Sequence, residues 1–333
     1  MKKSNIKIGF IGAGSIGSLF GGYLASIKSE IYSTEVILFC RKNNADAINK
    51  NGLVMHKDKA ILEIKNIKAF TNMNDFKEFF LKESNYAFDF IFLSTKTYDI
   101  ETALSHYKKL VDNCKKLVIL QNGIDNEELV SKYCDKKKII RIITSNGALL
   151  EKPGYVIHTG KGFTKLGYPF FSDLNLIEND FEMAQLELRL LCDLLNLAGL
   201  EAIIVDDILK ECWEKIFVNI GINAFGALTR LKNGKLLENK GLKYLMGEAV
   251  KEAVEIAKMK NIDLPKKDFI ALTYDVAEKT SENKNSMLQD VLKGKKTEID
   301  FINGRILKYA KELDIKTPIN ELLTYLVKGL EYS

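Results

Sequence analysis

The sequence predicts an α/β domain built on a parallel sheet, followed by an all-helical domain. Short apolar runs alternate with amphipathic stretches along the first part of the chain, and only helical patterns follow residue 208. Strands that alternate with helices are typical of βαβ units, in which neighbouring strands run parallel. A length of 333 residues allows two domains with a sizeable core in each. We therefore expect a first domain over residues 1–207 and a second over residues 208–333.

Composition and charge are those of an ordinary soluble globular protein, with 46% hydrophobic and 28% charged residues. The net charge is +5, but the lysines are interspersed with Asp and Glu, which argues against a nucleic-acid partner. No segment carries the long run of uncharged apolar residues that spans a membrane. The five cysteines include no C-x-x-C pair, so we expect no disulfides, no metal site and a reduced, cytoplasmic protein.

The predicted elements of the first domain follow from these apolar runs. Short runs indicate buried strands over residues 6–11, 36–40, 88–95, 117–120, 139–144 and 201–205. Longer amphipathic stretches predict helices over residues 15–29, 98–113 and 181–198. Residues 52–67 indicate a small hairpin, and residues 153–168 a glycine-rich, β-like segment.

A glycine-rich turn, GAGSIG, joins the first strand to the first helix. In this setting Gly12 permits a tight turn, Gly14 lets the backbone approach a pyrophosphate, and Gly17 lets the helix pack closely on the strand. The helix N-terminus then offers its N–H groups to the phosphates. The alternative is a plain tight turn. We predict a Rossmann-type dinucleotide site that includes Gly12, Ala13, Gly14, Ser15, Ile16 and Gly17.

The end of the second strand selects between cofactors. An NAD site usually places an acidic residue there to bind the ribose 2′-hydroxyl. This chain has Arg41 and Lys42 instead, and two cations suit the 2′-phosphate of NADP. Residues 28–34 indicate an insertion before this strand. We predict that Arg41 binds NADP(H); the alternative is that both cations are surface charges.

Two further strands end in polar residues. STK, at 94–96, ends one strand, and QNG, at 121–123, ends another. In an open α/β sheet, ligands bind at the carboxyl ends of the strands. This position suits Lys96 for a cofactor phosphate or a substrate carboxylate, and Asn122 for a bridge between cofactor and substrate. Either residue can equally be a helix cap or a turn residue.

An unusual apolar stretch lies at the start of the second domain. Residues 216–228 are apolar on every side apart from two asparagines, and a helix of that kind is buried. Lys215, Asn219 and Asn223 are spaced by four, so they form one line along the helix. Burying an ammonium or a carboxamide without partners costs several kcal/mol. The line must therefore meet polar groups, either in a ligand or in a structural network between helices.

A second polar cluster lies in residues 283–306. Within it, Thr297–Asp300 has the spacing of a capping box, with Asp in place of Glu or Gln, and predicts the start of a helix. Glu298 is then either a carboxylate near a helix N-terminus or the partner of a buried Lys215.

Together these motifs resemble the ketopantoate reductase (2-dehydropantoate 2-reductase) family. The resemblance covers nearly the whole chain, and its last three segments are specific in combination. The matching segments are GAGSIG at 12–17, Lys96, QNG at 121–123, NGA at 146–148, PGYVIHTG at 153–160, WEKIFVNIGINAFGALT at 213–229, NSMLQD at 285–290 and GKKTEIDFING at 294–304. The resemblance implies a Rossmann-type domain followed by a helical domain, similar to 6-phosphogluconate dehydrogenase.

The resemblance also implies a reaction, the NADPH-dependent reduction of 2-dehydropantoate to pantoate in pantothenate and coenzyme A biosynthesis. It implies that Lys215 is the general acid and that Glu298 is catalytic and contacts the cofactor. The other implied cofactor contacts outside the glycine turn are Arg41, Lys96, Asn122 and Ala148. The implied substrate-binding residues are Asn122, Lys215, Asn219, Asn223, Asn233 and Ser286. One departure is Lys295, where the family commonly has arginine.

Two other functions stay open at this point. A reductase of the same build can act on another 2-keto or 3-hydroxy acid, although the TEID and NSM segments argue against the β-hydroxyacid dehydrogenases. A non-catalytic NADPH-binding sensor is the third hypothesis, and an intact Lys215 and Glu298 argue against it. The expected partner is a small ketoacid, and the expected state is a monomer or a homodimer. His158 is predicted to be a packing or turn residue, and Trp213 to anchor its helix in the core.

Overall fold

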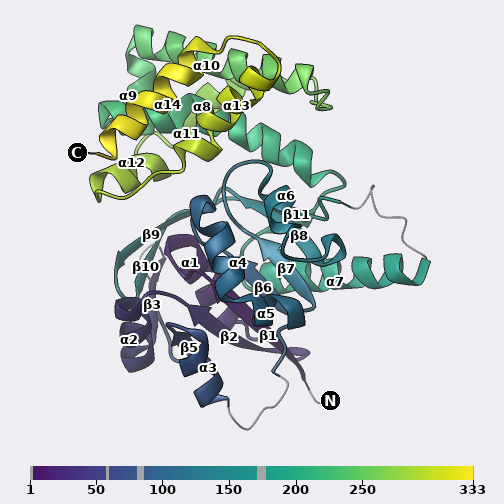
Figure 1. The fold of residues 1–333 in the computed structure, drawn as a ribbon. Helices are drawn as coiled ribbons and strands as arrows, with labels where there is room; N and C mark the ends of the chain where they lie inside the picture. Colours follow the sequence, from purple (N-terminus) through teal and green to yellow (C-terminus); the bar gives the residue numbers. More distant parts are fainter. Residues whose placement is uncertain (1–2, 58–59, 81–85, 171–177, 333) are drawn as a thin grey trace. The chain divides into compact units, whose positions relative to one another are not determined.

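The computed structural model of the chain describes residues 3–57, 60–80, 86–170 and 178–332. Contacts divide the chain into two compact units (Figure 1). Unit 1 contains residues 1–121 and 125–208, and unit 2 contains residues 122–124 and 209–333. The short segment 122–124 therefore groups with the C-terminal part of the chain, although it follows a strand of unit 1.

Unit 1 is built on a sheet that has eight strands within the described residues, in the order β12-β11-β8-β7-β6-β1-β2-β5. Every neighbouring pair is parallel except β8 and β11. Strands β6 and β8 are buried along their whole length, as expected for a parallel sheet with both faces covered. The strands are β1 (Ser4–Ile11), β2 (Tyr32–Phe39), β5 (Ile67–Phe70), β6 (Phe90–Leu93), β7 (Lys116–Ile119), β8 (Ile139–Thr144), β11 (Thr164–Gly167) and β12 (Ala202–Ile204).

Helices cover both faces of this sheet (Figure 1). Phe10 and Ile11 are neighbours in β1, so their side chains point to opposite faces and enter two separate cores. The core around Phe10 includes residues of α1 (Ser15–Ala25), α2 (Lys42–Asn51) and α7 (Glu178–Leu197). The core around Ile11 includes residues of α3 (Met73–Phe79), α4 (Ile100–His106), α5 (Lys108–Asn113) and α6 (Asn126–Val130). The sheet is therefore the middle layer of three.

A smaller sheet of unit 1 packs against α1, in the order β4-β3-β10-β9. Its strands are β3 (Leu53–Lys57), β4 (Ala60–Ile64), β9 (Gly147–Lys152) and β10 (Tyr155–Gly160). Strands β3 and β4 pair antiparallel, so the hairpin predicted over residues 52–67 is confirmed. Strands β9 and β10 also pair antiparallel and are joined by a turn at Gly154, where φ is +72°.

Several predicted boundaries in unit 1 are wrong. Strand β2 begins at Tyr32 rather than at residue 36, because it pairs with β1 from its first residue, so part of the predicted insertion is strand. The first helix ends at Ala25 rather than at residue 29, and the Ser26 hydroxyl donates to the Gly22 carbonyl there. The helix predicted over residues 98–113 is divided into a 3₁₀ turn, α4 and α5. At the break between α4 and α5, the Tyr107 ring packs against Phe39 with centroids 4.9 Å apart.

Unit 2 is helical. Its long helix α8 (Ile208–Thr229) is continuous through the apolar stretch, and Trp213 near its start packs on Phe217 and Tyr309, which confirms the predicted anchor. None of the helices that the structure describes is both long and apolar enough to cross a membrane. The other helices are α9 (Asn233–Glu238), α10 (Lys240–Met259), α11 (Phe269–Lys279), α12 (Ser286–Leu292), α13 (Asn303–Glu312) and α14 (Pro318–Leu330).

The helix start predicted at Thr297–Asp300 is wrong. Residues Ile299–Phe301 form a 3₁₀ turn, and α13 begins only at Asn303. The Thr297 hydroxyl donates to Glu331 at 2.7 Å and accepts from the N–H of Ile299 at 3.3 Å. In a capping box, the hydroxyl would instead accept from the backbone N–H of the residue three positions later. The bond to Glu331 gives Thr297 a partner outside the predicted helix.

Candidate active site

The glycine turn, residues 12–17, has the geometry that lets the protein backbone come close to a ligand. Gly12 has φ of +92°, and a Cβ there would lie 2.5 Å from the backbone N of Thr95. At Gly17 a Cβ would lie 2.4 Å from Ser94 Oγ, so only glycine lets α1 pack this closely on β6. Around Gly14, by contrast, a Cβ would meet only the Gly12 carbonyl, at 3.9 Å. The open side of the turn is therefore at Gly14 and the N-terminus of α1.

Hydrogen bonds hold the glycine turn to three other segments of unit 1. Ser94 Oγ donates to the Gly12 carbonyl at 3.1 Å, and Asn44 Nδ2 donates to the Ala13 carbonyl at 3.0 Å. Ser15 Oγ accepts from the N–H of Leu150 at 3.0 Å, which ties the start of α1 to β9. Because Ala148 lies two residues earlier in β9, the structure brings the predicted contact Ala148 beside the glycine turn. These three bonds hold the turn in place within unit 1.

The carboxyl ends of β6 and β7 are also linked within unit 1. Gln121 Nε2 donates to the Thr95 carbonyl at 2.9 Å and to the Thr95 hydroxyl at 3.0 Å. Lys96 follows as a half-buried residue that caps a 3₁₀ turn. The structure therefore brings the segment that carries Lys96 next to the glycine turn, since Thr95 is also the neighbour of Gly12.

Arg41 lies at the N-terminal cap of α2, directly after Cys40 at the end of β2. Its side chain and that of Lys42 are exposed. No acidic residue lies in the first turn of α2 or of α1. The first turns of both helices therefore carry no carboxylate, which favours anionic ligands at their N-termini. Burial raises the pKa of the Cys40 thiol to about 11, so this neighbour is neutral.

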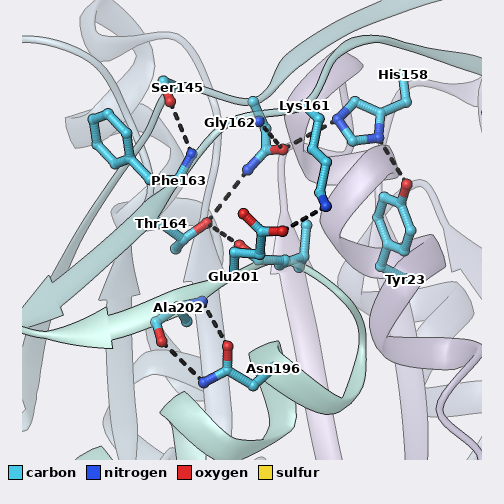
Figure 2. A network of polar contacts seen from close by, with 12 residues as sticks. Tyr23, Ser145, His158, Lys161, Gly162, Phe163, Thr164, Asn196, Glu201 and Ala202 are labelled. Carbon is cyan, nitrogen blue, oxygen red and sulfur yellow. Dashed lines mark hydrogen bonds and ion pairs between the residues drawn. The ribbon is translucent and has the colours of Figure 1, made fainter.

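A polar network fixes the start of β9 (Figure 2). Asn146 Oδ1 accepts from the N–H of Gly162 at 3.0 Å, which identifies the oxygen end of this carboxamide. His158 Nε2 lies 3.1 Å from the same oxygen and therefore carries the proton. In the neutral ring His158 Nδ1 then accepts from the Tyr23 hydroxyl at 2.7 Å. His158 is thus a hydrogen-bonding link from α1 to the NGA segment, and it pairs with Ala148 in the sheet register.

Unit 2 carries the predicted polar line on α8. Lys215 and Asn219 are half-buried, whereas Asn223 is buried with 5% exposure. The expectation of a buried Lys215 is therefore met only in part, because the line is buried toward Asn223 and only half-buried at Lys215 and Asn219. Lys215 Nζ donates to Asn122 Oδ1 at 2.8 Å, and both residues belong to unit 2. The structure thus brings together two predicted site residues that are 93 positions apart in the sequence.

Asn233 and Asn285 form a carboxamide pair beside α8. Asn233 Nδ2 donates to the Thr280 hydroxyl at 2.9 Å, and Asn233 Oδ1 lies 3.5 Å from Asn285 Nδ2. Asn285 Nδ2 also reaches the Ile222 carbonyl at 3.3 Å. Both side chains are buried and bonded within the protein, so the structure gives Asn233 a structural role beside the predicted substrate role.

Ser286 and Glu298 lie in the C-terminal part of unit 2. Ser286 is exposed at the first position of α12, directly after the buried cap Asn285. Glu298 is buried, with 6% exposure, at the cap of the 3₁₀ turn that precedes α13. Its predicted partnership with Lys215 and its catalytic role stay predictions. Among the described residues, no group of His, Cys, Asp and Glu could hold a metal ion.

The motifs did not single out Asn44, which bonds to the glycine turn, or Asn285, which bonds to α8, as site residues. Each is a buried asparagine whose carboxamide bonds to backbone far away in the chain. The available signal was their position: Asn44 lies in the first turn of α2, Asn285 caps α12, and buried apolar residues follow each of them in the helix. A buried carboxamide on an apolar face needs partners. The sequence does not say which ones.

Comparisons with known proteins cover both units. Residues 8–169 match the family described as "Ketopantoate reductase PanE/ApbA", and residues 207–331 match "Ketopantoate reductase PanE/ApbA C terminal". A relative from Pyrococcus horikoshii, named 2-dehydropantoate 2-reductase, is 38% identical over 330 residues, which are 98% of this chain and 98% of the relative.

Solved structures with the same fold also align along the whole chain. The ternary structure of D-mandelate dehydrogenase with NADH and anilino(oxo)acetate has a TM-score of 0.81 at 26% identity, over 98% of each chain. A PanE/ApbA family ketopantoate reductase from Ralstonia eutropha has a TM-score of 0.79 at 24% identity, again over 98% of each chain. The predicted fold class, a Rossmann-type domain followed by a helical domain, is confirmed. The chain belongs to the ketopantoate reductase family, whose members are dinucleotide-dependent reductases.

Proposed function

We propose that this chain reduces the ketone of 2-dehydropantoate to pantoate with NADPH, as a step of pantothenate and coenzyme A biosynthesis. Family membership over both parts of the chain and the names of the curated relatives support the reaction. The observation that carries the proposal is the ammonium of Lys215, which the Asn122 carboxamide holds on the polar face of α8.

NADPH fits the residues of unit 1. The open side of the glycine turn at Gly14 accommodates a pyrophosphate against the N-terminus of α1. Arg41, exposed at the cap of α2, supplies a fixed positive charge for the ribose 2′-phosphate. Lys96 and Ala148 lie on segments that adjoin the glycine turn, where they suit further cofactor contacts. Of these four features, the charge of Arg41 is the one that favours NADPH over NADH, because the two nucleotides differ only in the 2′-phosphate.

Lys215 acts as the general acid in this proposal. When bound, NADPH supplies the hydride that adds to the keto carbon. Negative charge then grows on the keto oxygen, and an ammonium placed against it stabilises that charge and afterwards donates its proton. Asn122 orients the ammonium with a 2.8 Å hydrogen bond and adds no charge. A neutral carboxamide therefore positions Lys215 without quenching its charge.

Neutral side chains and one carboxylate complete the proposed site. Asn219 and Asn223 continue the line from Lys215 along α8 and suit the hydroxyl and carboxylate oxygens of the substrate. Ser286 and Asn233 are the remaining proposed substrate contacts. Glu298 is the proposed partner that tunes Lys215 and contacts the cofactor. Asn122 is proposed to contact substrate and cofactor as well as Lys215.

A reductase of another 2-ketoacid is the second candidate. The specific observation in its favour is the likeness to D-mandelate dehydrogenase, which was solved with NADH and an oxoacetate. That likeness is at 26% identity, whereas the Pyrococcus horikoshii relative is at 38%. The closer relationship favours 2-dehydropantoate.

Product analysis tests the proposal. Purified protein would be incubated with NADPH and 2-dehydropantoate, and separately with NADH and with pyruvate, and pantoate would be quantified by mass spectrometry. We expect one pantoate formed per NADPH oxidised, and little product from the other pairs. Protein that binds NADPH but oxidises it with none of the ketoacids would contradict the proposal and support a sensor.

The cellular location and the oligomeric state of the protein stay predictions. None of the five cysteines, all of which lie in the described residues, forms a disulfide, and a reducing cytoplasmic location is proposed. We propose a monomer or a homodimer with a small ketoacid as its partner.

A further inference from the structure

Asn44 links three segments of unit 1 through one buried side chain. It lies in the first turn of α2, and 6% of it is exposed. Its Nδ2 donates to the carbonyl of Ala13, in the glycine turn, at 3.0 Å. Its Oδ1 accepts from the N–H of Gly154, in the turn between β9 and β10, at 2.7 Å. The same carboxamide thus reaches two backbone groups that lie 31 and 110 positions away in the sequence.

The Ala13 carbonyl is the point at which Asn44 acts on the glycine turn. This oxygen accepts from both Asn44 Nδ2 and Ser18 Oγ, the latter at 3.1 Å. Because a peptide unit is planar, two donors on one carbonyl fix the plane that leads from Ala13 into Gly14 and α1. The open side of the turn, at Gly14, therefore keeps one orientation.

Gly154 is the other end of the link. It has φ of +72°, and a Cβ there would lie 3.1 Å from the Cβ of Ala47, so the turn sits directly on α2. Gly154 joins β9, which carries Ala148, to β10, which carries His158. Asn44 therefore connects the helix that begins after Arg41 both to the glycine turn and to the strand that carries Ala148.

We propose that Asn44 is a positioning residue for the dinucleotide: it holds the glycine turn in the orientation that receives the pyrophosphate. The inference rests on the proposed nucleotide-dependent function but not on the identity of the ketoacid. Asparagine suits this position because one rigid group supplies a donor and an acceptor and adds no charge near phosphates. Aspartate would keep the acceptor for Gly154 and lose the donor for Ala13, so it separates the two contacts.

Asn49 provides a matched control on the same helix. Its carboxamide also makes two bonds to backbone, with Nδ2 donating to the Ala69 carbonyl at 2.7 Å and Oδ1 accepting from the Ala69 N–H at 2.9 Å. These bonds tie α2 to β5, not to the glycine turn. Removing them loosens the helix without touching the turn.

The test measures the Kd of NADPH and of NADH by nicotinamide fluorescence, without ketoacid, for wild type, Asn44→Ala, Asn44→Asp and Asn49→Ala. We expect about a tenfold rise in both values for Asn44→Ala, since loss of a hydrogen bond to a buried group corresponds to roughly a factor of ten. Asn44→Asp should bind more weakly still, because its carboxylate faces the Ala13 carbonyl and the phosphates. Asn49→Ala should bind as wild type, and kcat at saturating NADPH should stay within about threefold for Asn44→Ala.

Other outcomes would overturn the inference. Unchanged Kd values in both Asn44 variants, or an equal rise in Asn49→Ala, would show that Asn44 only supports the fold. An Asn44→Ala protein that loses NADPH but not NADH would show that it acts through the 2′-phosphate instead. If Asn44→Ala does not fold, Asn44→Asp carries the same comparison. Wild type that binds both nucleotides but reduces no ketoacid would refute the proposed reaction and leave this test intact.

Discussion

The surroundings of Lys215 explain how a largely apolar helix can carry a charged side chain. The Asn122 carboxamide accepts a hydrogen bond from its ammonium, and the side chain is only half-buried, so the charge keeps a partner and access to ligand. We predict that Lys215→Ala lowers kcat by about 10²-fold or more, because it removes the acid that stabilises the developing alkoxide. The measurement is steady-state NADPH oxidation with 2-dehydropantoate, together with the Kd of NADPH, which should not change.

Lys210→Ala is the control for this prediction. Lys210 lies on the same helix, pairs with Asp263 at the surface, and has no proposed catalytic role. It should retain near wild-type kcat. Unchanged kcat in Lys215→Ala would sink the assignment of the general acid.

A second prediction concerns the role of Arg41 in nucleotide binding. Its guanidinium is exposed at the cap of α2, where a 2′-phosphate can form charge-assisted hydrogen bonds. Arg41→Ala should raise the Kd of NADPH by roughly tenfold and that of NADH by much less. Nucleotide titrations check the ratio, with Lys50→Ala, an exposed lysine at the other end of α2, as control. Equal losses for both nucleotides would show that Arg41 does not bind the 2′-phosphate.

Among single residues, the sequence predicts those that a local backbone conformation requires. It misses those whose hydrogen-bond partners lie far away in the chain. The special conformation and close packing of Gly12 and Gly17 follow from a short motif. The contact between Lys215 and Asn122 requires α8 and the loop after β7 to fold together, so spacing identified each residue but not the pair. Asn44 bonds to backbone atoms that any residue type can supply, so no sequence motif marks its partners.

Among the elements, types were predicted better than ends. The parallel strands and the long helix α8 follow from runs of apolar residues, whose period identifies them. The ends depend on tertiary pairing and on competing side-chain hydrogen bonds. β2 is extended by its register with β1, and α1 stops where Ser26 bonds back to Gly22. Thr297 does not cap a helix, because its hydroxyl accepts from the N–H of Ile299, two residues later, where a 3₁₀ turn begins.

Gly221 tests how tightly α8 is packed. A Cβ there would lie 2.5 Å from Thr273 and 2.9 Å from Val250, and both side chains are fully buried. Alanine gains up to about 1 kcal/mol of helix propensity over glycine, but overpacking a core typically costs about 1–3 kcal/mol. We expect Gly221→Ala to lower the unfolding temperature, measured by calorimetry.

Gly329 is the matched substitution for Gly221. It lies in α14, and a Cβ there would meet nothing within 4 Å. Gly329→Ala should therefore keep or slightly raise the unfolding temperature. A Gly221→Ala protein as stable as Gly329→Ala would contradict the close packing of α8 on α10 and α11.

For the whole molecule, a two-part organisation was predicted and two compact units are observed. Segment 122–124 groups with unit 2, where Asn122 bonds to Lys215 of α8, and a single boundary placed along the sequence does not include this segment. The boundary at residues 207 and 208 stays a prediction, which limited proteolysis can examine.

The cysteines give a whole-molecule prediction about reactivity. Burial raises the pKa of Cys40 and Cys134 to about 11 and that of Cys114 to about 12. A thiol reacts as its thiolate, so these three should label slowly at pH 7.5 and faster as the pH rises toward 11. Unfolding in urea should release all five thiols for rapid reaction. Mass spectrometry after timed alkylation checks this, and rapid labelling of Cys40 in the folded protein would contradict it.

We propose that this chain acts on 2-dehydropantoate with NADPH. The most direct measurement is kcat/KM for 2-dehydropantoate against that for phenylglyoxylate, the ketoacid formed when mandelate is oxidised, each with NADPH and with NADH. We predict that 2-dehydropantoate with NADPH exceeds each other pair by at least about 10²-fold, a difference of roughly 3 kcal/mol in transition-state stabilisation. A higher value for phenylglyoxylate, or for NADH, would contradict the proposed substrate or the proposed role of Arg41.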